Sequence, residues 1–227
     1  MNSNYYTITP TNSREKSVLS SAALLVFATM KIIGLTGGIA TGKSTVARFL
    51  EELGAQIIDA DQLSREVVAP GSPTLKQIVE ALGPGLLLPD GALDRKRLRS
   101  IIFNDASLRH RLEAITHPAI KELALKRLDK ARQSGAAVAV YMAPLLIEAG
   151  ATGRVDEIWV VTVRPELQLE RLMARDHCSS DEALRIVAAQ MPLAEKEKQG
   201  AVVIDNSNGL EQTRQQVTNA WKQNIRI

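Results

Sequence analysis

The stretch Gly37-Gly38-Ile39-Ala40-Thr41-Gly42-Lys43-Ser44 organises the rest of the chain. It matches G-x-x-x-x-G-K-[ST], the pattern of a phosphate-binding loop. A mostly apolar run of strand length, from Lys31 to Thr36, comes just before it, and the segment from Lys43 to Leu53 follows with apolar residues at helical spacing. The motif therefore lies between an expected strand and an expected helix, which is the context that such a loop requires.

Each part of this loop has a role in holding a nucleotide. Glycines let the backbone fold around phosphate groups, and the start of the following helix adds positive potential. We expect Lys43 to reach the β- and γ-phosphates and Ser44 to ligate Mg²⁺. The alternative, a glycine-rich turn with a solvated lysine, is disfavoured by the strand and helix on either side.

Composition limits the possible functions. With 227 residues, 45% of them hydrophobic, the chain suits one packed α/β domain with an insertion, or one and a half small domains. The net charge is only +3 and the basic residues are scattered, so nucleic-acid binding is not expected, whereas a phosphorylated ligand suits this balance. The single cysteine, Cys178, excludes an intrachain disulfide framework and a multi-cysteine metal site, and we expect a free thiol in a reducing compartment.

The first 29 residues carry no part of this pattern. Residues 1–16 are polar, and the apolar run from Val18 to Met30 with Arg14 and Lys16 before it faintly resembles a signal peptide. That run is too short for a membrane span. We favour the alternative that translation begins at Met30, since export would separate an ATP-dependent enzyme from its nucleotide. Residues 1–29 are expected to lie outside the fold and to be poorly ordered.

Two carboxylates follow the second expected strand, Gln56 to Asp59. Asp59 and Asp61 are two residues apart, so on an extended chain they point the same way, at the strand end where open α/β sheets bind ligands. The alternative is that Asp61 caps a helix running from Gln62 to Val68. We favour a functional role for Asp61, and leave that of Asp59 open.

Residues 61–133 have a helical pattern without clear strands. Helices are expected over Thr74–Leu82, Asp94–Phe103, Ala106–Ala114 and Pro118–Arg132, and such a block between parallel strands is expected to shape an acceptor site. The basic cluster that begins at Arg95 is by default a solvated face, and the alternative is a phosphate grip on the substrate. His117 precedes Pro118 at the expected start of the last helix, where it either begins the helix or faces the ligand.

The remaining segments complete an α/β fold. Strands are expected over Ala136–Met142, Glu157–Val163 and Ala201–Ile204, and helices over Pro165–Asp176, from a Ser179-Ser180-Asp181-Glu182 capping box to Gln190, and over Gly209–Ile225. The pattern predicts a doubly wound parallel sheet of about five strands with helices on both faces. Arg171 and Arg175 lie four residues apart, on one helix face.

These features select among nucleotide-binding classes. The Asn-Lys-x-Asp pattern of GTPases is absent from the sequence, and the strand Ala136–Met142 ends without a Walker-B aspartate; Ala201–Asp205 fits that pattern but lies near the end of the chain. A small-molecule kinase needs a phosphate-binding loop, a carboxylate near the acceptor hydroxyl and arginines on a mobile lid. Asp61 and the Arg171/Arg175 pair meet the last two needs, so the residues indicate phosphoryl transfer to a small acceptor.

From Met30 to about Trp221 the sequence resembles the dephospho-CoA kinases, a family of P-loop kinases. The motifs that carry the resemblance occur in the family's order: Leu35-Thr36-Gly37-Gly38-Ile39-Ala40-Thr41-Gly42-Lys43-Ser44-Thr45, Ile58-Asp59-Ala60-Asp61, Leu93-Asp94-Arg95, Thr116-His117-Pro118, Pro144-Leu145-Leu146-Ile147-Glu148, Gln168-Leu169-Glu170-Arg171 with Arg175-Asp176, and Val203-Ile204-Asp205-Asn206-Ser207. The resemblance implies transfer of the ATP γ-phosphate to the ribose 3′-hydroxyl of dephospho-CoA, with Mg²⁺, in the last step of coenzyme A synthesis.

The resemblance also implies roles for single residues. The ATP loop falls on Ala40 to Thr45, the base on Asp61 and the lid arginine on Arg171. The donor side would further include Arg175 and Asn206, the latter near the adenine. The acceptor side would include Thr36, Asp59, Asp61, Arg95, His117, Pro144, Leu145 and Glu148. Thr41 and Ala143 depart mildly from the family pattern, where a serine and a larger apolar residue are usual.

The expected organisation is a nucleotide-binding core over 30–60 and 134–227, a lid over about 165–192 and a substrate-binding insertion over 61–133. The alternatives are another nucleoside or nucleotide kinase, or a regulator that binds ATP without turnover. We expect a cytoplasmic protein, favour a monomer and expect no nucleic-acid or membrane partner.

Overall fold

The computed structural model describes residues 30–225, and for residues 103 and 104 it describes the backbone alone. The expectations for residues 1–29 lie outside this range. Within it, one parallel sheet of five strands has the order β2-β3-β1-β4-β5. The strands are β1 Lys31–Gly37, β2 Gln56–Asp59, β3 Val138–Met142, β4 Glu157–Thr162 and β5 Val202–Asp205. β1 is central, so the loop after it emerges from the middle of the sheet.

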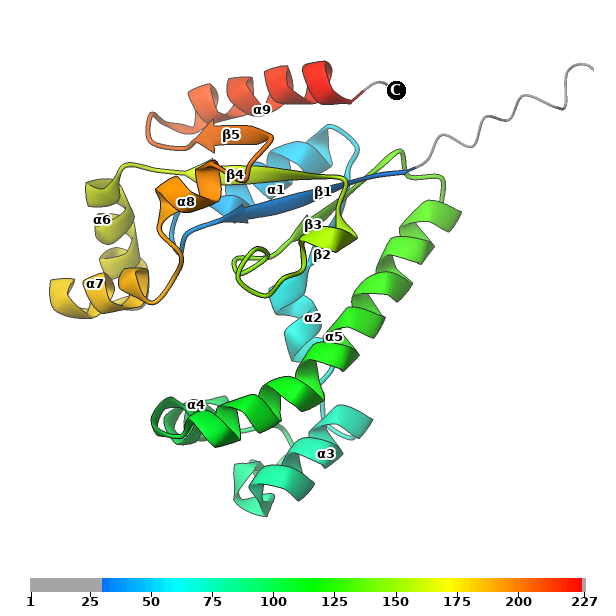
Figure 1. The fold of residues 1–227 in the computed structure, drawn as a ribbon, viewed down its shortest axis with the longest axis vertical. Helices are drawn as coiled ribbons and strands as arrows, with labels where there is room; N and C mark the ends of the chain where they lie inside the picture. The colour runs from blue at the N-terminus through cyan, green and yellow to red at the C-terminus, as the bar shows by residue number, and fades with distance from the viewer. Residues whose placement is uncertain (1–29, 226–227) are drawn as a thin grey trace, which may run out of the picture.

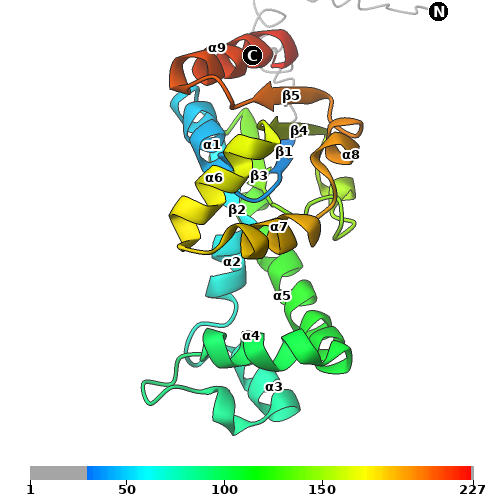
Figure 2. The same cartoon turned by 90° about the vertical axis from the view of Figure 1, so that its left-hand side faces the viewer.

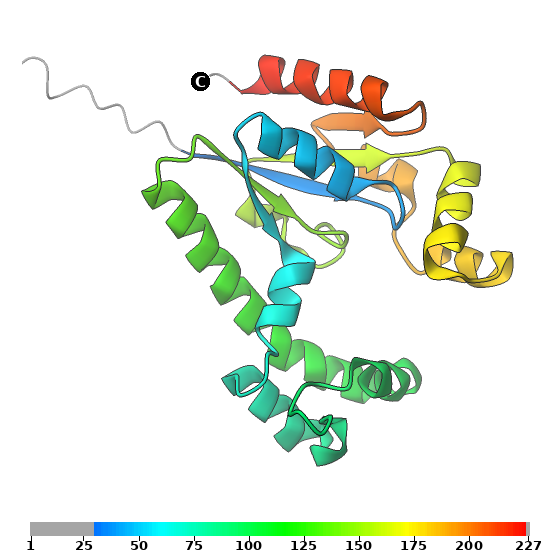
Figure 3. The ribbon, with the colours of Figure 1, turned by 180° about the vertical axis from the view of Figure 1, so that it is seen from behind.

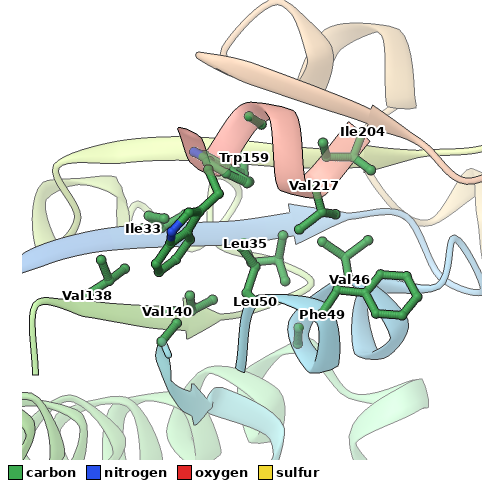
Figure 4. Close-up of a cluster of buried hydrophobic side chains, with 14 of the residues drawn as sticks. Ile33, Leu35, Val46, Phe49, Leu50, Val138, Val140, Trp159, Ile204 and Val217 are labelled. Carbon is green, nitrogen blue, oxygen red and sulfur yellow. The ribbon is translucent and has the colours of Figure 1, made fainter. Parts of the chain in front are cut away.

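Side chains of successive strand residues enter two different cores, as a pleated strand requires. Val138 and Val140 belong to a cluster shared with α1 (Lys43–Glu52) and α9 (Leu210–Asn224), whereas Ala139 and Tyr141 belong to a cluster shared with α5 (Ala106–Gln133). Figure 4 shows Val138 and Val140 in the same cluster as Val46 and Leu50 of α1. Helices cover both faces of the sheet, with α1 and α9 in front in Figure 3 and α5 on the opposite face. The doubly wound parallel fold predicted from the sequence is confirmed.

The block between β2 and β3 is helical and has a third core of its own. Its elements are α2 Ala60–Glu66, α3 Pro73–Leu82, the short 3₁₀ helix η1 Pro84–Leu86, α4 Arg95–Asn104 and α5. Leu75, Ile78, Leu86 and Leu98 are buried together there. Figures 1 and 2 show α3 and α4 beside the lower end of α5, away from the sheet, so α2 and α5 connect this block to the sheet.

One helix differs from the sequence prediction. We expected separate helices over 106–114 and from Pro118, but α5 runs without a break over 28 residues with Pro118 inside it. A proline removes one backbone hydrogen bond and bends a helix, and the helix continues when its two ends are packed on other elements. α5 packs against α3 and α4 at one end and against β2 at the other, and its axis changes direction along its length in Figures 1 and 3.

The segment after β4, where the sequence predicts a lid, is helical. Helix α6 (Pro165–Asp176) is followed by α7 (Ser180–Ala188), and the predicted capping box between Ser179 and Glu182 is present. A further short helix, α8 (Leu193–Glu197), was not predicted, and a 3₁₀ turn, η2 (Thr152–Arg154), precedes β4. Within residues 30–225, no helix combines the length and the apolar character needed to cross a membrane.

Candidate active site

The loop between β1 and α1 has a backbone that only glycine accommodates at two positions. Gly42 has a φ of 90° and Gly37 a φ of 152°, both in the region that side chains disfavour. A β-carbon on Gly42 would collide with the side-chain amide of Asn206, and one on Gly37 would collide with the carbonyl oxygen of Val161. The two glycines therefore allow β4 and the segment after β5 to press against the loop.

Asn206 connects this loop to α9 through two side-chain hydrogen bonds. Its Nδ2 donates to the Thr41 carbonyl at 2.8 Å, and its Oδ1 accepts from the Thr213 hydroxyl of α9 at 2.9 Å. The Thr41 hydroxyl in turn donates to the Gly38 carbonyl at 2.9 Å. Both polar atoms of the Asn206 side chain therefore form hydrogen bonds that support the loop. The residue also lines a small cavity, described below.

Lys43 folds back over its own loop. Its ammonium donates to the carbonyls of Gly37 at 3.1 Å and Gly38 at 2.7 Å. Burial, with the nearby charges of Lys196 and Arg175, lowers the pKa of Lys43 to about 8, and the carboxylates of Asp61 and Asp59 oppose this shift. The ammonium is therefore desolvated, and a bound anionic group would stabilise its charge.

A cavity of about 750 Å³ opens beside the loop. Its walls come from the loop and α1, from α2, from the middle of α5, from the turn after β3 and from the lid. The lining residues are Ile39, Ala40, Gly42, Lys43, Ser44, Ala60, Asp61, Ser64, His117, Ile120, Tyr141, Ala143, Pro144, Leu145, Leu146, Ala149, Ala151, Arg154, Arg171, Arg175 and Gln190. It thus brings together residues that are more than 100 positions apart, at the carboxyl edge of the sheet where such folds bind ligands.

Asp61 lies in the first turn of α2 and lines this cavity. The cap of α2 is Asp59, whose Oδ1 accepts from the Asp61 backbone N–H at 2.8 Å, so the alternative in which Asp61 caps a helix is wrong. Desolvation by the cavity walls raises the pKa of Asp61, the charge of Asp59 raises it further, and Lys43 opposes the rise. The Asp61 carboxylate is therefore free for a ligand and is made more basic by its surroundings.

The lid arginines reach the same cavity from α6. Arg171 lines it, and its Nη2 donates to the Asn206 carbonyl at 3.1 Å. Arg175 also lines it, and pairs through two hydrogen bonds with Asp176. A second cavity of about 230 Å³ lies beside the loop. Its lining residues are Ala40, Gly42, Thr45, Arg171, Asn206, Gly209 and Leu210. The two cavities share Ala40, Gly42 and Arg171, and Asp61 lines only the larger one.

The acceptor-side residues expected from the sequence separate into two groups. His117, Pro144 and Leu145 line the large cavity. Within the described residues, Thr36, Asp59, Arg95 and Glu148 do not. Arg95 begins α4 on the helical block and is exposed, and Asp59 is the cap described above.

Thr36 and Glu148 support the turn after β3 instead. The Thr36 hydroxyl donates to the Pro144 carbonyl at 3.2 Å, and the Lys196 ammonium donates to the same carbonyl at 2.7 Å. Lys196 also pairs with the Glu148 carboxylate at 2.8 Å, and its side chain is 0% exposed. A buried lysine thus joins α8 to the turn that forms the apolar wall of the cavity.

Sequence reasoning gave no role to several polar residues that line or support the site, among them Lys196, Gln168 and Gln190. Lys196 lies in Glu195-Lys196-Glu197-Lys198, a run that reads as an exposed charged face. Gln168 and Gln190 bind the Ile39 backbone from the lid, the first donating from Nε2 to the carbonyl at 2.8 Å and the second accepting at Oε1 from the N–H at 2.8 Å. No spacing rule marks a glutamine that binds a backbone group so distant in sequence.

Comparison with known proteins gives a consistent result. The family model described as dephospho-CoA kinase matches residues 31–212. The chain is 62% identical over 192 residues to a protein named dephospho-CoA kinase from Geobacter sulfurreducens, covering 85% of this chain and 98% of that one. It is 52% identical to another of that name from Moorella thermoacetica, over 86% of this chain and 92% of that one.

Solved structures also resemble the fold. The structure of dephospho-CoA kinase from Campylobacter jejuni has a TM-score of 0.66 and 29% identity, covering 86% of this chain and 96% of that one. TT1252 from Thermus thermophilus has a TM-score of 0.78 and 30% identity, over 87% of this chain and 99% of that one. The family model covers most of the chain and the relatives exceed half identity over nearly their whole length, so the chain belongs to the dephospho-CoA kinase family.

Proposed function

We propose that this protein transfers the γ-phosphate of ATP to the ribose 3′-hydroxyl of dephospho-CoA, which completes coenzyme A. The observation that carries the proposal is the shared cavity, in which Lys43 of the phosphate-binding loop and the Asp61 carboxylate line one continuous space. Membership of the dephospho-CoA kinase family supplies the identity of the two substrates.

The donor nucleotide lies with its phosphates against the loop. Backbone N–H groups at the start of α1 and the Lys43 ammonium hold the phosphates, and Arg171 and Arg175 neutralise charge on the transferring group from the lid. The small cavity lined by Asn206, Thr45 and Leu210 suits the adenosine part, since it adjoins the loop at Ala40 and Gly42 and is not lined by Asp61.

The acceptor occupies the other end of the large cavity. Its apolar wall, made by Leu145, Leu146 and Ile120 among others, suits the adenine ring, and His117 offers a polar contact. Asp61 accepts the hydrogen bond of the 3′-hydroxyl and orients the oxygen toward the γ-phosphorus. The bond from that oxygen to phosphorus forms as the bond to the ADP oxygen breaks, and Asp61 takes the proton.

Mg²⁺ fits this site through a small set of oxygen atoms. The Ser44 hydroxyl and the Asp61 carboxylate line the same cavity, and among the described residues no group of three or more acidic, histidine or cysteine side chains forms a metal cage. Mg²⁺ commonly binds through one or two protein oxygens, substrate phosphates and water. Ser44 would hold it directly and Asp61 through water, and the ion would neutralise phosphate charge.

The test is to incubate the protein with dephospho-CoA and Mg-ATP and to follow ADP release and the mass of the acceptor. We expect the acceptor to gain one phosphoryl group, placed at the 3′-oxygen by phosphorus NMR, and Lys43→Ala to abolish the gain. Phosphorylation of a nucleoside or nucleotide in preference to dephospho-CoA would indicate a different small-molecule kinase. ATP binding without ADP release for any acceptor would indicate a regulator and contradict the proposal.

We further propose that the protein acts as a monomer in the cytoplasm, where ATP is supplied. Residues of a single chain line both substrate cavities, which supports a site complete in one copy. Light scattering at the concentration of the activity assay measures the mass directly, and activity that rises more steeply than protein concentration would contradict the monomer.

A further inference from the structure

Gln190 follows α7 at the end of the lid and contacts the phosphate-binding loop. Its Oε1 accepts a hydrogen bond from the Ile39 backbone N–H at 2.8 Å, and its side chain lines the large cavity. None of the roles assigned above to the loop, Asp61 or the lid arginines uses this contact.

The orientation of the Gln190 amide is set by this hydrogen bond. A backbone N–H can only donate, so the amide oxygen must face Ile39 and the Nε2 group must face elsewhere. Within residues 30–225, Nε2 of Gln190 donates to no protein acceptor, and no buried side-chain nitrogen or oxygen is left without a partner. Nε2 is therefore a donor open to solvent, on a side chain that borders the cavity.

The anchor of this amide is itself rigid. Gln168, whose side chain is buried, donates from Nε2 to the Ile39 carbonyl at 2.8 Å. Both backbone polar groups of Ile39 therefore bind glutamines of the lid. The Gln190 side chain, which is hydrogen-bonded to Ile39, is consequently held in one position. Such fixed donors are the kind that stabilise developing charge without reorganising.

Ile39 lies next to the part of the loop that the Lys43 ammonium contacts. Lys43, which reaches the β- and γ-phosphates, donates to the carbonyls of Gly37 and Gly38, directly before Ile39. Gln190 and Lys43 line the same cavity, and both side chains bind the backbone within Gly37–Ile39, so the Gln190 amide borders the space where the γ-phosphate is expected.

We propose that Nε2 of Gln190 donates a hydrogen bond to the γ-phosphate of bound ATP and retains that bond to the phosphoryl group as it transfers. Gln190 gains and loses no proton in the step. The phosphorus–oxygen bond to ADP breaks, the bond to the acceptor oxygen forms, and the acceptor proton goes to Asp61. The proposal rests on the kinase function proposed above and adds a donor to its transition state.

Two substitutions at this position distinguish the proposal from a purely supporting role. Gln190→Glu keeps an oxygen that accepts from Ile39 but replaces the donor with a negative charge, whereas Gln190→Ala removes both. If Nε2 contacts the γ-phosphate, the glutamate variant is the worse of the two, with kcat lower by about 10²-fold or more. If Gln190 only holds the loop, the glutamate variant stays near wild type and exceeds the alanine variant, which would overturn the proposal.

Nucleotide binding provides a readout that needs no turnover. We expect Gln190→Ala to weaken binding of the β,γ-imido analogue of ATP by about tenfold, as for loss of a hydrogen bond to a charged group, and binding of ADP by less than about twofold. Equal weakening of both nucleotides would overturn the proposal, since ADP lacks the γ-phosphate. This comparison uses no acceptor, so it tests the role of Gln190 whether or not dephospho-CoA proves to be the substrate. A wild-type protein that is inactive on dephospho-CoA would contradict only the proposed function.

Gln199→Glu is the matched control. It adds the same charge nine positions further along, on an exposed residue that does not line the cavity. We expect it to bind both nucleotides as wild type does. A loss of γ-phosphate selectivity in this control equal to that of Gln190→Glu would attribute the effect to general charge and overturn the proposal. Melting temperatures of all variants establish that each is folded.

Discussion

Asp61 and Asp59 are separated by one residue, yet their surroundings give them different chemistry. Asp59 satisfies the first turn of α2 by accepting from the Asp61 N–H. The Asp61 carboxylate is therefore not needed to cap the helix, and it lines the same cavity as Lys43. A residue adjacent to a cap can thus supply a ligand-binding group at no cost to the helix.

We therefore expect Asp61→Asn to separate catalysis from stability. Removing the charge and basicity should lower kcat by about 10²-fold or more, the usual contribution of general acid–base catalysis. The melting temperature and the ATP dissociation constant should change little, because the cap is Asp59 and the loop is untouched. Steady-state kinetics, calorimetry and thermal melting measure the three quantities. Near-normal turnover would mean that the hydroxyl needs no carboxylate at this position.

The lowered pKa of Lys43 predicts how nucleotide binding depends on pH. The charged ammonium binds phosphate, and in the free protein it is lost as the pH rises through about 8. Bound phosphates stabilise the charged form, so binding must take up a proton above that pH. We expect the ADP dissociation constant to rise by up to about tenfold per pH unit above about 8 and to be constant below it down to about 7.

Titration calorimetry in two buffers of different ionisation enthalpy measures both the affinity and the proton uptake. Lys43→Ala is the control, since it should bind weakly with no such dependence. A wild-type affinity that stays flat to about pH 9.5 would show that Lys43 keeps its usual pKa.

At the scale of elements, the sequence pattern was sufficient wherever a local rule decides the structure. The strand before the loop, the helix after it and the capping box of α7 follow from hydrophobic spacing and capping chemistry, and the structure has all three. Pro118 was misread because a local rule places proline at helix starts, whereas packing at both ends of α5 outweighs one lost hydrogen bond. The short α8 has too few residues for a periodic signal.

Of the site, the sequence could indicate the loop, Asp61 and the lid arginines, because each belongs to a motif or a strand end. It could not indicate which residues support others. Lys196 alternates with glutamates as a solvated lysine does, and only the fold shows that it is buried against Glu148 and the Pro144 carbonyl. Long-range pairing of this kind leaves no periodic trace in one sequence.

Lys196 is expected to position the turn after β3, which forms the apolar wall of the cavity. Lys196→Met keeps the length of the side chain but removes the ammonium that pairs with Glu148 and donates to the Pro144 carbonyl, which then keeps only the longer hydrogen bond from Thr36. This loss should lower the free energy of unfolding by about 2–3 kcal/mol, less than for a fully buried pair because Glu148 is partly exposed. The loosened turn should raise KM for dephospho-CoA several-fold and leave KM for ATP nearly unchanged.

Lys198→Met is the matched control two residues away. Lys198 pairs with Glu195 in solvent, with side chains 69% and 53% exposed, so its loss should have little effect. Denaturant unfolding and kinetics with each substrate in turn measure the outcome. Equal effects of the two substitutions would mean that burial of Lys196 contributes nothing to the site.

At the scale of the whole molecule, the cavity lies where α2 and α5 join the helical block to the sheet, and its apolar walls belong to the core shared by the sheet and α5. The sheet and its helices supply the loop, Asp61 adjoins them at the start of α2, and the helical block has its own apolar cluster. α5 belongs to both, because Ala124 and Leu128 pack in a core of the sheet while Leu112 and Ile115 pack against the core of the block. His117 and Ile120 line the cavity between these two contacts. The bend of α5 therefore determines the position of the helical block relative to the phosphate-binding loop.

Pro118→Ala should straighten this helix. Alanine restores the missing N–H and removes the ring that clashes with the preceding turn, a change worth about 3 kcal/mol in helix propensity, so the protein should remain folded and become no less stable. The helical block should shift, raising KM for dephospho-CoA several-fold while ADP binding to the loop is unchanged. Spin labels on the exposed Lys76 of α3 and Lys222 of α9, each changed to cysteine after Cys178→Ser, would report the displacement as a changed label distance. If the distance changes and KM does not, the acceptor site does not depend on the placement of the block; if neither changes, packing at the two ends of α5 sets the bend and proline only tolerates it.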